Sequence, residues 1–328
     1  MTDNTHAIVV GNNGGPEVLE WAAVEVAAPG PGEVTVKVAA AGVNFIDVYH
    51  RDGLYPLKLP FTPGVEGAGV VTAIGPEVTA VEVGARVAWS GALGSYAEDR
   101  CIAAGDLVEV PEAVSLDLAA AVMLQGMTAH YLSHDTYPLA EGDTCLVHAG
   151  AGGVGHLLIQ MAKARGATVF ATVGSQEKAA VATAAGADHV INYAESDFKD
   201  AVEEIAGPKP LSVVYDGVGA DTFERGLELL GRRGVMVTFG NASGPPPPTD
   251  ALHLMRLGSL YVTRPTLFDY NATRSQLEQR SDDLFGWIAS GELEVRIGSS
   301  FPMAEAADAH RALQGRATTG KVLLDAAG

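Results

Sequence analysis

The sequence predicts an α/β protein with two parts, a β-rich domain and a domain built on a doubly wound parallel sheet. Three observations carry this prediction. Short Val-rich runs separated by Gly and Pro fill the first third of the chain, and strand-like and helix-like segments alternate from Thr144 onward. A chain of 328 residues, 47% of them hydrophobic, is also longer than one core usually supports.

The β-rich part extends from about Ala7 to Pro111. Its runs include GEVTVKVAAAG, GAGVVTAIG and VGARVAWSG, and helices are expected to be scarce there. Near Ser115 the composition changes to an Ala-rich helical stretch, DLAAAVMLQGMTAHYLSH, with Ser115 or Asp117 as its cap. We place the transition between the two domains in this stretch.

In the second part, short apolar runs are separated by amphipathic segments. The expected strands are CLVHA, TVFATV, HVINY, SVVYD, VMVTF and LYVTR, and the expected helices include HLLIQMAKARG, QEKAAVATAAG and DTFERGLELLG. This alternation predicts a parallel sheet with helices on both faces. A long helix from about Thr273 to Ser290 and a strand ending in KVLLD follow, and we expect this tail to return to the first domain. The predicted boundaries are 1–123 with 266–328 for the β-rich domain and 124–265 for the other.

A glycine-rich loop follows the first strand of the second domain. Gly150, Gly152 and Gly155 form G-x-G-x-x-G, with Gly153 and Val154 between the last two, immediately before a helix. Glycines at these positions allow a tight turn, close approach of backbone amides to a pyrophosphate, and close packing of helix on sheet. A glycine-rich turn without a ligand is the alternative, but the flanking strands and helix favour dinucleotide binding.

The end of the next strand decides which dinucleotide is expected. An acidic residue there accepts hydrogen bonds from the ribose 2′-hydroxyl, but this strand ends in Gly174 and Ser175 without an acid. Lys178 lies one helical turn further on and Tyr193 follows the third strand, so a hydroxyl, an ammonium and a phenol can converge on a 2′-phosphate. We therefore expect NADPH rather than NADH. The alternative is that Lys178 is an ordinary solvent-exposed lysine that binds no phosphate.

The charge and the cysteines restrict the partners and the compartment. The net charge is −19 and the pI is about 4.7, which opposes binding to nucleic acid and to anionic lipid. Only Cys101 and Cys145 occur, so neither a disulfide framework nor a Cys-rich metal site is expected. With no recognisable leader and no membrane-length apolar run, a cytoplasmic protein is expected.

By its motifs the chain resembles the zinc-free quinone oxidoreductases related to zeta-crystallin, within the medium-chain dehydrogenase/reductase superfamily. The resemblance rests on GAGGVG with Gly142, Asp143, Gln160 and Lys163 around it, and on NFIDVYHRDGLYP, TPGVEGAGVV, VVYDGVG, GSLYVTRP and RATTGK elsewhere. It implies a GroES-like catalytic domain built from both ends of the chain, a Rossmann domain between them, a homodimer, and a cleft for cofactor and substrate.

The resemblance also implies roles for individual residues. Asn44, Tyr49 and Tyr55 are expected to line the nicotinamide side of the cleft and to orient the reactants. Further cofactor contacts are implied for residues at the ends of the last three strands and in the C-terminal segment, namely Gly217, Phe239, Gly240, Val262, Arg264 and Arg316. Alternatively, the two tyrosines only pack against the β-rich domain, and Arg264 is only a charged residue on an edge strand. Asp47 and Glu66 are expected to make structural hydrogen bonds rather than to act as acid and base.

No catalytic metal is expected. Zinc alcohol dehydrogenases of the same superfamily carry a ligating Cys in the early loop and a Gly-His-Glu motif, where this chain has Asn44 to Asp47 and Gly64-Val65-Glu66. Valine cannot bind zinc. The substrate is then a quinone or another carbonyl compound electrophilic enough to accept hydride without a metal.

Other readings remain open. An NADPH-dependent enoyl or enone reductase shares the fold and the cofactor, with Tyr49 or Tyr55 as a possible proton donor. A structural or RNA-binding role is opposed by the intact glycine loop and by the acidic charge. Leu260 to Arg264 form an apolar sheet edge, which predicts a homodimer that pairs this strand across a two-fold axis.

Overall fold

The computed structural model describes residues 4–326 and divides into two compact units. Unit 1 comprises Met1–Met127 and Asn271–Gly328, and unit 2 comprises Thr128–Tyr270. These divisions fall four and five residues later than the boundaries expected at 123/124 and 265/266. The first division lies inside helix α2 (Leu116–Tyr131), which explains why composition alone placed it only approximately.

Unit 2 is a six-stranded parallel sheet in the order β10-β9-β8-β11-β12-β13. The chain starts in the middle and adds strands outward in both directions, which is the doubly wound arrangement. The strands are β8 (Thr144–Val147), β9 (Thr168–Val173), β10 (His189–Asn192), β11 (Leu211–Asp216), β12 (Leu230–Thr238) and β13 (Tyr261–Thr263). The predicted parallel sheet is therefore confirmed.

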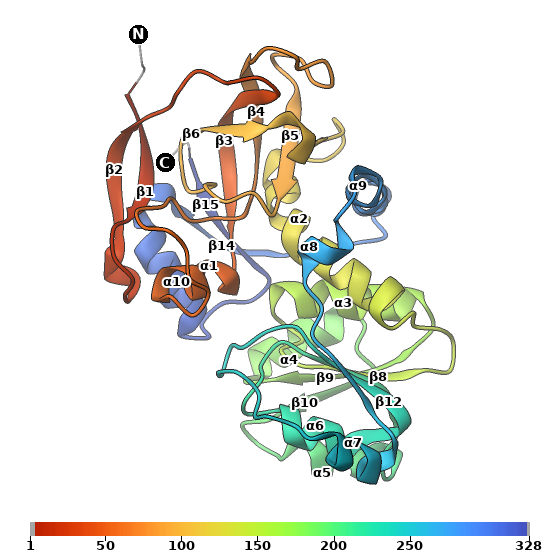
Figure 1. The fold of residues 1–328 in the computed structure, drawn as a ribbon. Coiled ribbons are helices and arrows are strands. Elements are labelled where there is room, and N and C mark those ends of the chain that lie inside the picture. The colour runs from red at the N-terminus through yellow and green to blue at the C-terminus, as the bar shows by residue number, and fades with distance from the viewer. Residues whose placement is uncertain (1–3, 327–328) are drawn as a thin grey trace. The chain divides into compact units, whose positions relative to one another are not determined.

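Helices cover both faces of this sheet. In Figure 1, α3 and α4 lie on one face and α5, α6 and α7 on the other. Their bounds are α3 (Gly153–Ala164), α4 (Gln176–Ala184), α5 (Phe198–Ala206), α6 (Phe223–Leu229) and α7 (Ala251–Gly258), with the short α8 (Leu267–Tyr270) at the end of the unit. Buried side chains such as Leu146, Phe170 and Val214 fill the space between sheet and helices.

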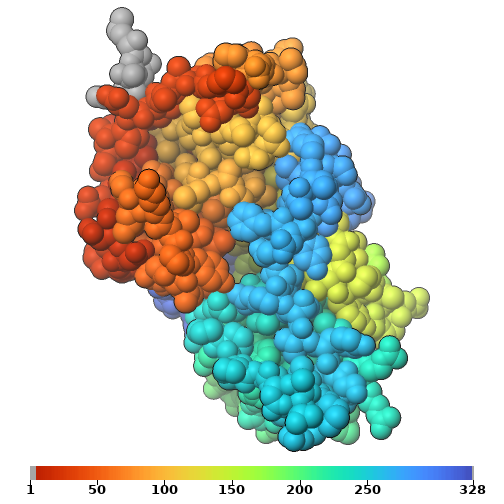
Figure 2. Space-filling view, in the orientation of Figure 1, coloured from red at the N-terminus to blue at the C-terminus, as the bar shows by residue number. Residues whose placement is uncertain are grey.

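The last strand of unit 2 is an exposed edge. Tyr261 is 54% exposed, and on the preceding helix α7 Leu252 and Met255 are 57% and 58% exposed. Figure 2 shows the α7 segment at the surface of its unit. Unit 2 thus presents apolar side chains beside an unpaired strand edge.

Unit 1 is a β-rich fold closed by the C-terminal segment. Its main sheet has the order β14-β15-β3-β4-β5-β7, β6 also pairs with β3, and β1 and β2 form a separate hairpin. The strands are β1 (Asn4–Val10), β2 (Leu19–Glu25), β3 (Glu33–Val43), β4 (Glu66–Ile74), β5 (Arg86–Ser90), β6 (Asp99–Ala103), β7 (Leu107–Glu109), β14 (Ile297–Pro302) and β15 (Lys321–Asp325). Strand β15 runs antiparallel to β3, so the end of the chain joins the sheet built by its beginning.

The helices of unit 1 include one that the strand pattern did not reveal. Helix α1 (Phe45–Asp52) follows β3 directly and ends at Gly53, whose φ of 88° suits a residue without a side chain. Helix α9 (Arg274–Ser290) was predicted and is capped by Thr273, and α10 (Ala306–Gln314) precedes β15. Ser115 caps α2, since its hydroxyl accepts a hydrogen bond from the amide of Leu118 at 3.2 Å. Within residues 4–326, no helix combines the length and the apolar character that crossing a bilayer requires.

Candidate active site

The glycine loop of unit 2 lies between β8 and α3, and it leaves no room for a side chain at Gly150 or Gly155. A Cβ on Gly155 would lie 2.3 Å from the carbonyl oxygen of Ala149, and a Cβ on Gly150 would lie 2.9 Å from the Cβ of Ala171. Gly152 precedes the first turn of α3, where the amides of a helix start point outward without intrahelical partners. The loop therefore offers backbone amides and a helix N-terminus to an anion such as a pyrophosphate.

No acidic residue stands at the end of β9 itself, as the sequence shows, although Glu195 reaches the start of α4, where its carboxylate accepts from Gln176 Nε2 at 3.2 Å. Tyr193 leans over Gly174 so closely that a Cβ there would lie 2.6 Å from the phenol oxygen. The Ser175 hydroxyl accepts a hydrogen bond from the backbone amide of Lys178 at 3.3 Å, which leaves its own proton available for a ligand. The structure thus brings Ser175, Lys178 and Tyr193 to the start of α4.

The other expected cofactor residues of unit 2 lie at the carboxyl ends of β11, β12 and β13. The ring of Phe239 packs on Gly217, and a Cβ on Gly240 would lie 2.3 Å from the Gly217 carbonyl oxygen. The Arg264 guanidinium donates to Thr238 Oγ1 at 3.2 Å and to the Gly240 carbonyl at 3.0 Å, so it holds these strand ends together. Val262 is 38% exposed on β13. These positions form the edge at which a doubly wound sheet binds ligands.

Sequence reasoning missed the role of Asp216 at the end of β11. Its fully buried carboxylate accepts from the amides of Val218 and Gly219 at 2.7 and 3.0 Å and from the Thr222 hydroxyl at 2.9 Å. These bonds fix the turn that leads into α6. The sequence does show an acidic residue followed by glycines at a strand end. That pattern is as typical of a turn as of a functional site, so it did not reveal this role.

Unit 1 contains a buried polar cluster centred on Asn44. The Asn44 side chain donates from Nδ2 to Glu66 Oε2 at 2.8 Å and to the Gly42 carbonyl at 3.2 Å. Its Oδ1 accepts from Lys321 Nζ at 2.9 Å and from Gln125 Nε2 at 3.1 Å. Both N–H groups and both lone pairs of the amide are therefore occupied by the protein itself.

Lys321 and Glu66 form a buried ion pair inside this cluster. The two side chains are 1% and 0% exposed and their charged groups are in direct contact. Burial lowers the pKa of Lys321, and the neighbouring Glu66 carboxylate opposes that change. Glu66 Oε1 also accepts from the Leu124 amide at 2.6 Å. A Cβ on Gly42 would lie 2.2 Å from Glu66 Oε2, so the glycine makes room for this pair.

A second chain of hydrogen bonds runs from Asp47 to Arg51. Arg51 can only donate, so its bond of 3.1 Å makes His310 Nδ1 the acceptor and places the histidine proton on Nε2. His310 then donates to the Tyr96 oxygen at 3.2 Å, and Tyr96 donates to Asp47 Oδ2 at 2.9 Å. Burial lowers the pKa of His310 to about 3, and the Arg51 charge acts in the same direction, which agrees with a neutral ring.

Asp47 lies at the receiving end of that chain. Its Oδ2 also accepts from the Asn44 amide at 2.9 Å, whereas its buried Oδ1 has no hydrogen-bond partner among the described residues. Burial raises the pKa of Asp47 to about 7, and the bonds from Asn44 and Tyr96 offset only part of that rise. The carboxyl group therefore titrates near neutral pH.

The two expected tyrosines form an aromatic group on and after α1. Tyr49 is 7% exposed and its ring meets that of Tyr55 edge to face at 5.2 Å. Tyr55 is 36% exposed, and its amide donates to the Tyr49 carbonyl at 2.9 Å. Arg316 lies exposed in the segment before β15, with a φ of 56°.

The side chains at the superfamily's zinc positions do not form a set of metal ligands. Asn44 is saturated by protein partners, Val65 is apolar and 1% exposed, and Glu66 is paired with Lys321. Among residues 4–326, no three His, Cys, Asp or Glu side chains come together in a group that could hold a metal ion. The positive charge beside Glu66 is supplied by an ammonium group.

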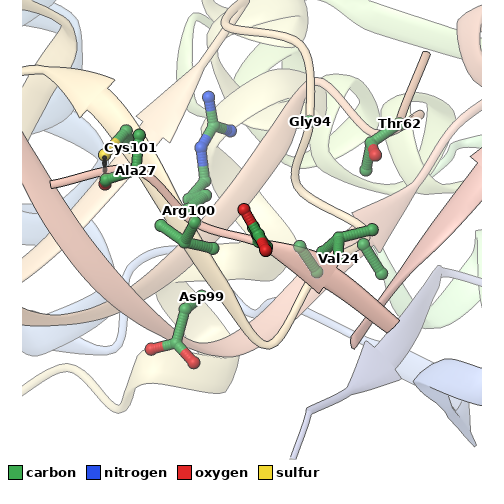
Figure 3. A pocket seen from close by; sticks show the side chains of 11 residues that line it. Val24, Ala27, Thr62, Gly94, Asp99, Arg100 and Cys101 are labelled. Carbon is green, nitrogen blue, oxygen red and sulfur yellow. Dashed lines mark hydrogen bonds between the residues drawn. The ribbon is translucent and has the colours of Figure 1, made fainter. Parts of the chain in front are cut away.

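Unit 1 also has a pocket of about 260 Å³, and none of the residues that line it belongs to the cluster around Asn44. Figure 3 shows it beside Val24, Thr62 and Arg100, with the Cys101 thiol directed at the Ala27 carbonyl. Arg100 donates to the Leu93 carbonyl at 2.9 Å and to Ser95 Oγ at 3.2 Å. Its guanidinium is therefore used to hold the preceding loop, and the pocket contains none of the predicted site residues.

A parallel sheet with a glycine loop in one unit and a β-rich fold with a buried polar cluster in the other are typical of two-domain dehydrogenases and reductases. Comparison with family models agrees: the alcohol dehydrogenase GroES-like domain matches residues 30–137 and the zinc-binding dehydrogenase family matches residues 153–282. The chain belongs to the quinone oxidoreductase family within this group.

Three relatives illustrate that membership. The chain is 48% identical to a quinone oxidoreductase of Pseudomonas aeruginosa over 95% of its own length and 96% of the relative's. It is 42% identical to a 2-haloacrylate reductase of a Burkholderia species, over 97% and 98% of the two chains. The structure of the Escherichia coli quinone oxidoreductase complexed with NADPH matches with a TM-score of 0.95 and 44% identity, covering 98% and 99%.

Proposed function

We propose that this protein reduces quinones with NADPH and without a metal. The observation that carries the proposal is a pair of features in unit 2: a loop with no room for a side chain at Gly150 or Gly155, and a β9 strand that ends in Gly174 and Ser175 instead of an acid. The relative of known structure was solved with NADPH, which supports the same cofactor here. When bound, the cofactor supplies the hydride, and the protein contributes binding and orientation.

The residues of unit 2 have distinct proposed roles toward NADPH. The amides of Gly150, Gly152, Gly153, Val154 and Gly155 hold the pyrophosphate at the start of α3. Beside Gly174, the Ser175 hydroxyl, the Lys178 ammonium and the Tyr193 phenol hold the 2′-phosphate. The remaining contacts are proposed for the residues at the other strand ends and the C-terminal segment, namely Gly217, Phe239, Gly240, Val262, Arg264 and Arg316.

In unit 1, we propose that Asn44, Tyr49 and Tyr55 orient the reacting groups. Since the Asn44 amide is saturated by Lys321, Glu66, Gly42 and Gln125, it acts as a positioning residue that keeps its neighbours in place. The rings of Tyr49 and Tyr55 meet edge to face, and the partly exposed Tyr55 offers an aromatic side chain with a phenol group, which suits contact with a quinone ring.

A second candidate is the reduction of an activated carbon–carbon double bond. The 42% identity to a 2-haloacrylate reductase favours it, because that name describes an unsaturated acid as substrate. Such a reaction needs a proton as well as a hydride, and Tyr49 or Tyr55 is the proposed donor.

Initial rates of NADPH oxidation with an ortho-quinone, a para-quinone, an aliphatic enal and 2-chloroacrylate distinguish the two candidates. The proposed function predicts that a quinone gives the highest kcat/KM. A higher value for the enal or for 2-chloroacrylate would replace it by the second candidate.

We also propose a cytoplasmic homodimer that pairs β13 across a two-fold axis. The exposed side chains of Tyr261, Leu252 and Met255 beside the strand edge support this pairing. Sedimentation tests it: the unchanged protein should sediment as a dimer, and Tyr261→Lys, which puts a charge on the edge, should sediment as a monomer. A monomer at all concentrations of the unchanged protein would rule the pairing out.

A further inference from the structure

The side-chain amide of Gln125 has only one possible orientation, because the charged groups of Glu66 and Lys321 fix the amide of Asn44 to which it is bonded. Glu66 is a carboxylate, so the Asn44 group at 2.8 Å from it must be the NH₂ group. Lys321 can only donate, so the Asn44 group at 2.9 Å from it must be the oxygen. Gln125 shares that oxygen at 3.1 Å and must present its own NH₂ group.

This orientation points an acceptor away from the cluster. Gln125 Oε1 is buried and has no hydrogen-bond partner among the described residues. Turning the amide over would not help, because it would set Oε1 against Asn44 Oδ1 and leave two lone pairs facing each other. A buried amide oxygen without a partner costs free energy, and such groups in native proteins are usually satisfied by water or by a ligand.

We infer that Gln125 Oε1 is a ligand-binding acceptor of the active site that takes a hydrogen bond from an O–H or N–H group of the bound product or cofactor. Two sources of that group fit the proposed function, on which the identity of the ligands rests. A hydroquinone carries hydroxyl donors, and the nicotinamide ring carries a carboxamide N–H. A quinone has only carbonyl acceptors, so its oxygen and Gln125 Oε1 repel each other.

The inference makes Gln125 a specificity residue. Reduction of a quinone converts a carbonyl acceptor into a hydroxyl donor, and a fixed acceptor therefore binds the product better than the substrate. Because the Asn44 amide is saturated and Gln125 is tied to it, the acceptor is held in place before any ligand arrives.

The test compares dissociation constants measured by calorimetry for ligands that differ in the donor. Tetramethyl-1,4-benzoquinone and its hydroquinone form one pair, and NADPH and its 3-acetylpyridine analogue, which lacks the carboxamide N–H, form the other. Gln125→Met removes the acceptor at similar volume. Gln279→Met, on the exposed face of α9, is the matched control and should change nothing.

We expect Gln125→Met to weaken one donor-bearing ligand about three- to tenfold while its donor-free counterpart changes by less than about twofold. Weakening of the hydroquinone identifies the hydroxyl as the source, and weakening of NADPH identifies the carboxamide. Equal change within both pairs, or no change in either, would overturn the inference and leave water as the partner of Oε1.

A second variant guards against a failure of Gln125→Met to fold. Gln125→Leu also removes the acceptor and brings no charge beside Lys321, so it should reduce the preference for the hydroquinone in the same way. An unchanged preference would also overturn the inference. Turnover of quinones by the unsubstituted protein is measured separately, so failure of the proposed function is distinguishable from failure of this one.

Discussion

Lys321 shows how much depends on single residues in unit 1. It is 1% exposed, yet its ammonium contacts Glu66 and donates to Asn44 Oδ1 at 2.9 Å. Taking both charges out of water is costly, and the cost is offset only while each charge keeps its partner. Removing one partner is therefore expected to be worse than removing both.

The first prediction concerns this pair. Lys321→Met should lower the free energy of unfolding by about 3–5 kcal/mol, because it leaves the Glu66 carboxylate buried without its counter-charge. The double variant Lys321→Met/Glu66→Gln should recover much of that loss, as measured by urea unfolding. Arg311→Met, which breaks an exposed pair with Asp308, is the control and should cost less than about 1 kcal/mol. A double variant as unstable as Lys321→Met would contradict the account.

Asp47 gives the second prediction, a dependence of stability on pH. Its pKa in the folded protein is about 7 against an ordinary value of 3.8, so between these values the native state holds a proton that the unfolded chain has lost. Stability attributable to Asp47 is therefore full below the ordinary pKa and falls as the pH rises through about 7. Asp47→Asn cannot ionise and lacks this fall.

Melting temperatures at about pH 5, 6.5 and 8 measure the effect. The difference in Tm between the unchanged protein and Asp47→Asn should move in favour of the variant as the pH rises. Asp282→Asn, an exposed change on α9, should follow the unchanged protein throughout. Parallel curves for Asp47→Asn and the unchanged protein would show that the carboxyl group has an ordinary pKa.

The third prediction concerns the choice of dinucleotide. Lys178→Ala removes the ammonium that we propose binds the 2′-phosphate, and one charge-assisted hydrogen bond is worth about 1.5–3 kcal/mol. NADPH binding should weaken about tenfold or more while NADH binding stays nearly unchanged. Lys37→Ala removes the same charge from an exposed position on β3 and should affect neither. Equal weakening of both cofactors would assign Lys178 to the fold or to the shared pyrophosphate.

At the scale of elements, the loop between β8 and α3 makes the tight turn that leads into the helix N-terminus. Gly150 and Gly155 are required by close contacts, not by positive φ angles: Gly155 faces the backbone carbonyl of Ala149, and Gly150 faces the side chain of Ala171 on β9. The sequence predicted this loop because its spacing and its flanking strand and helix are local features.

The fourth prediction tests the loop. Gly155→Ala should weaken NADPH and NADH together by at least about tenfold, because a methyl group 2.3 Å from the Ala149 carbonyl forces the loop to move away from the pyrophosphate position. Gly286→Ala, in the exposed middle of α9 where a Cβ meets no atom within 4 Å, is the control. It should leave binding unchanged and raise stability by about 0.5–1 kcal/mol. Selective loss of NADPH alone in Gly155→Ala would contradict the assignment.

Elements and clusters differed in how far the sequence could predict them. Strand and helix alternation in unit 2 and the helix after Thr273 follow from local periodicity, and both were predicted. Helix α1 was missed because its eight residues are fewer than the window of about 11 or more residues over which helical periodicity is recognised. The partners of Asn44 and Tyr96 were also missed, since Lys321 is 277 residues from Asn44 and His310 is 214 from Tyr96. Such contacts form only because β15 and α10 return to the sheet built by the start of the chain. The sequence pattern predicts that return but not which residues then meet.

At the scale of the whole molecule, the two units divide the work in the proposed function. Unit 2 carries the features that hold a dinucleotide, and unit 1 carries a buried polar cluster whose cation is Lys321 rather than a metal ion. In this account the rate depends on binding and orientation, so removing metals should leave it unchanged.

The most direct test follows the absorbance of NADPH after metal-depleted protein is mixed with NADPH and a para-quinone. The account predicts that NADPH is oxidised only when the quinone is present, in equal amounts and with a higher kcat/KM than NADH. It also predicts the same rate before chelation, after chelation and after zinc is added back. Absence of quinone-dependent oxidation, or activity that returns only with zinc, would contradict it.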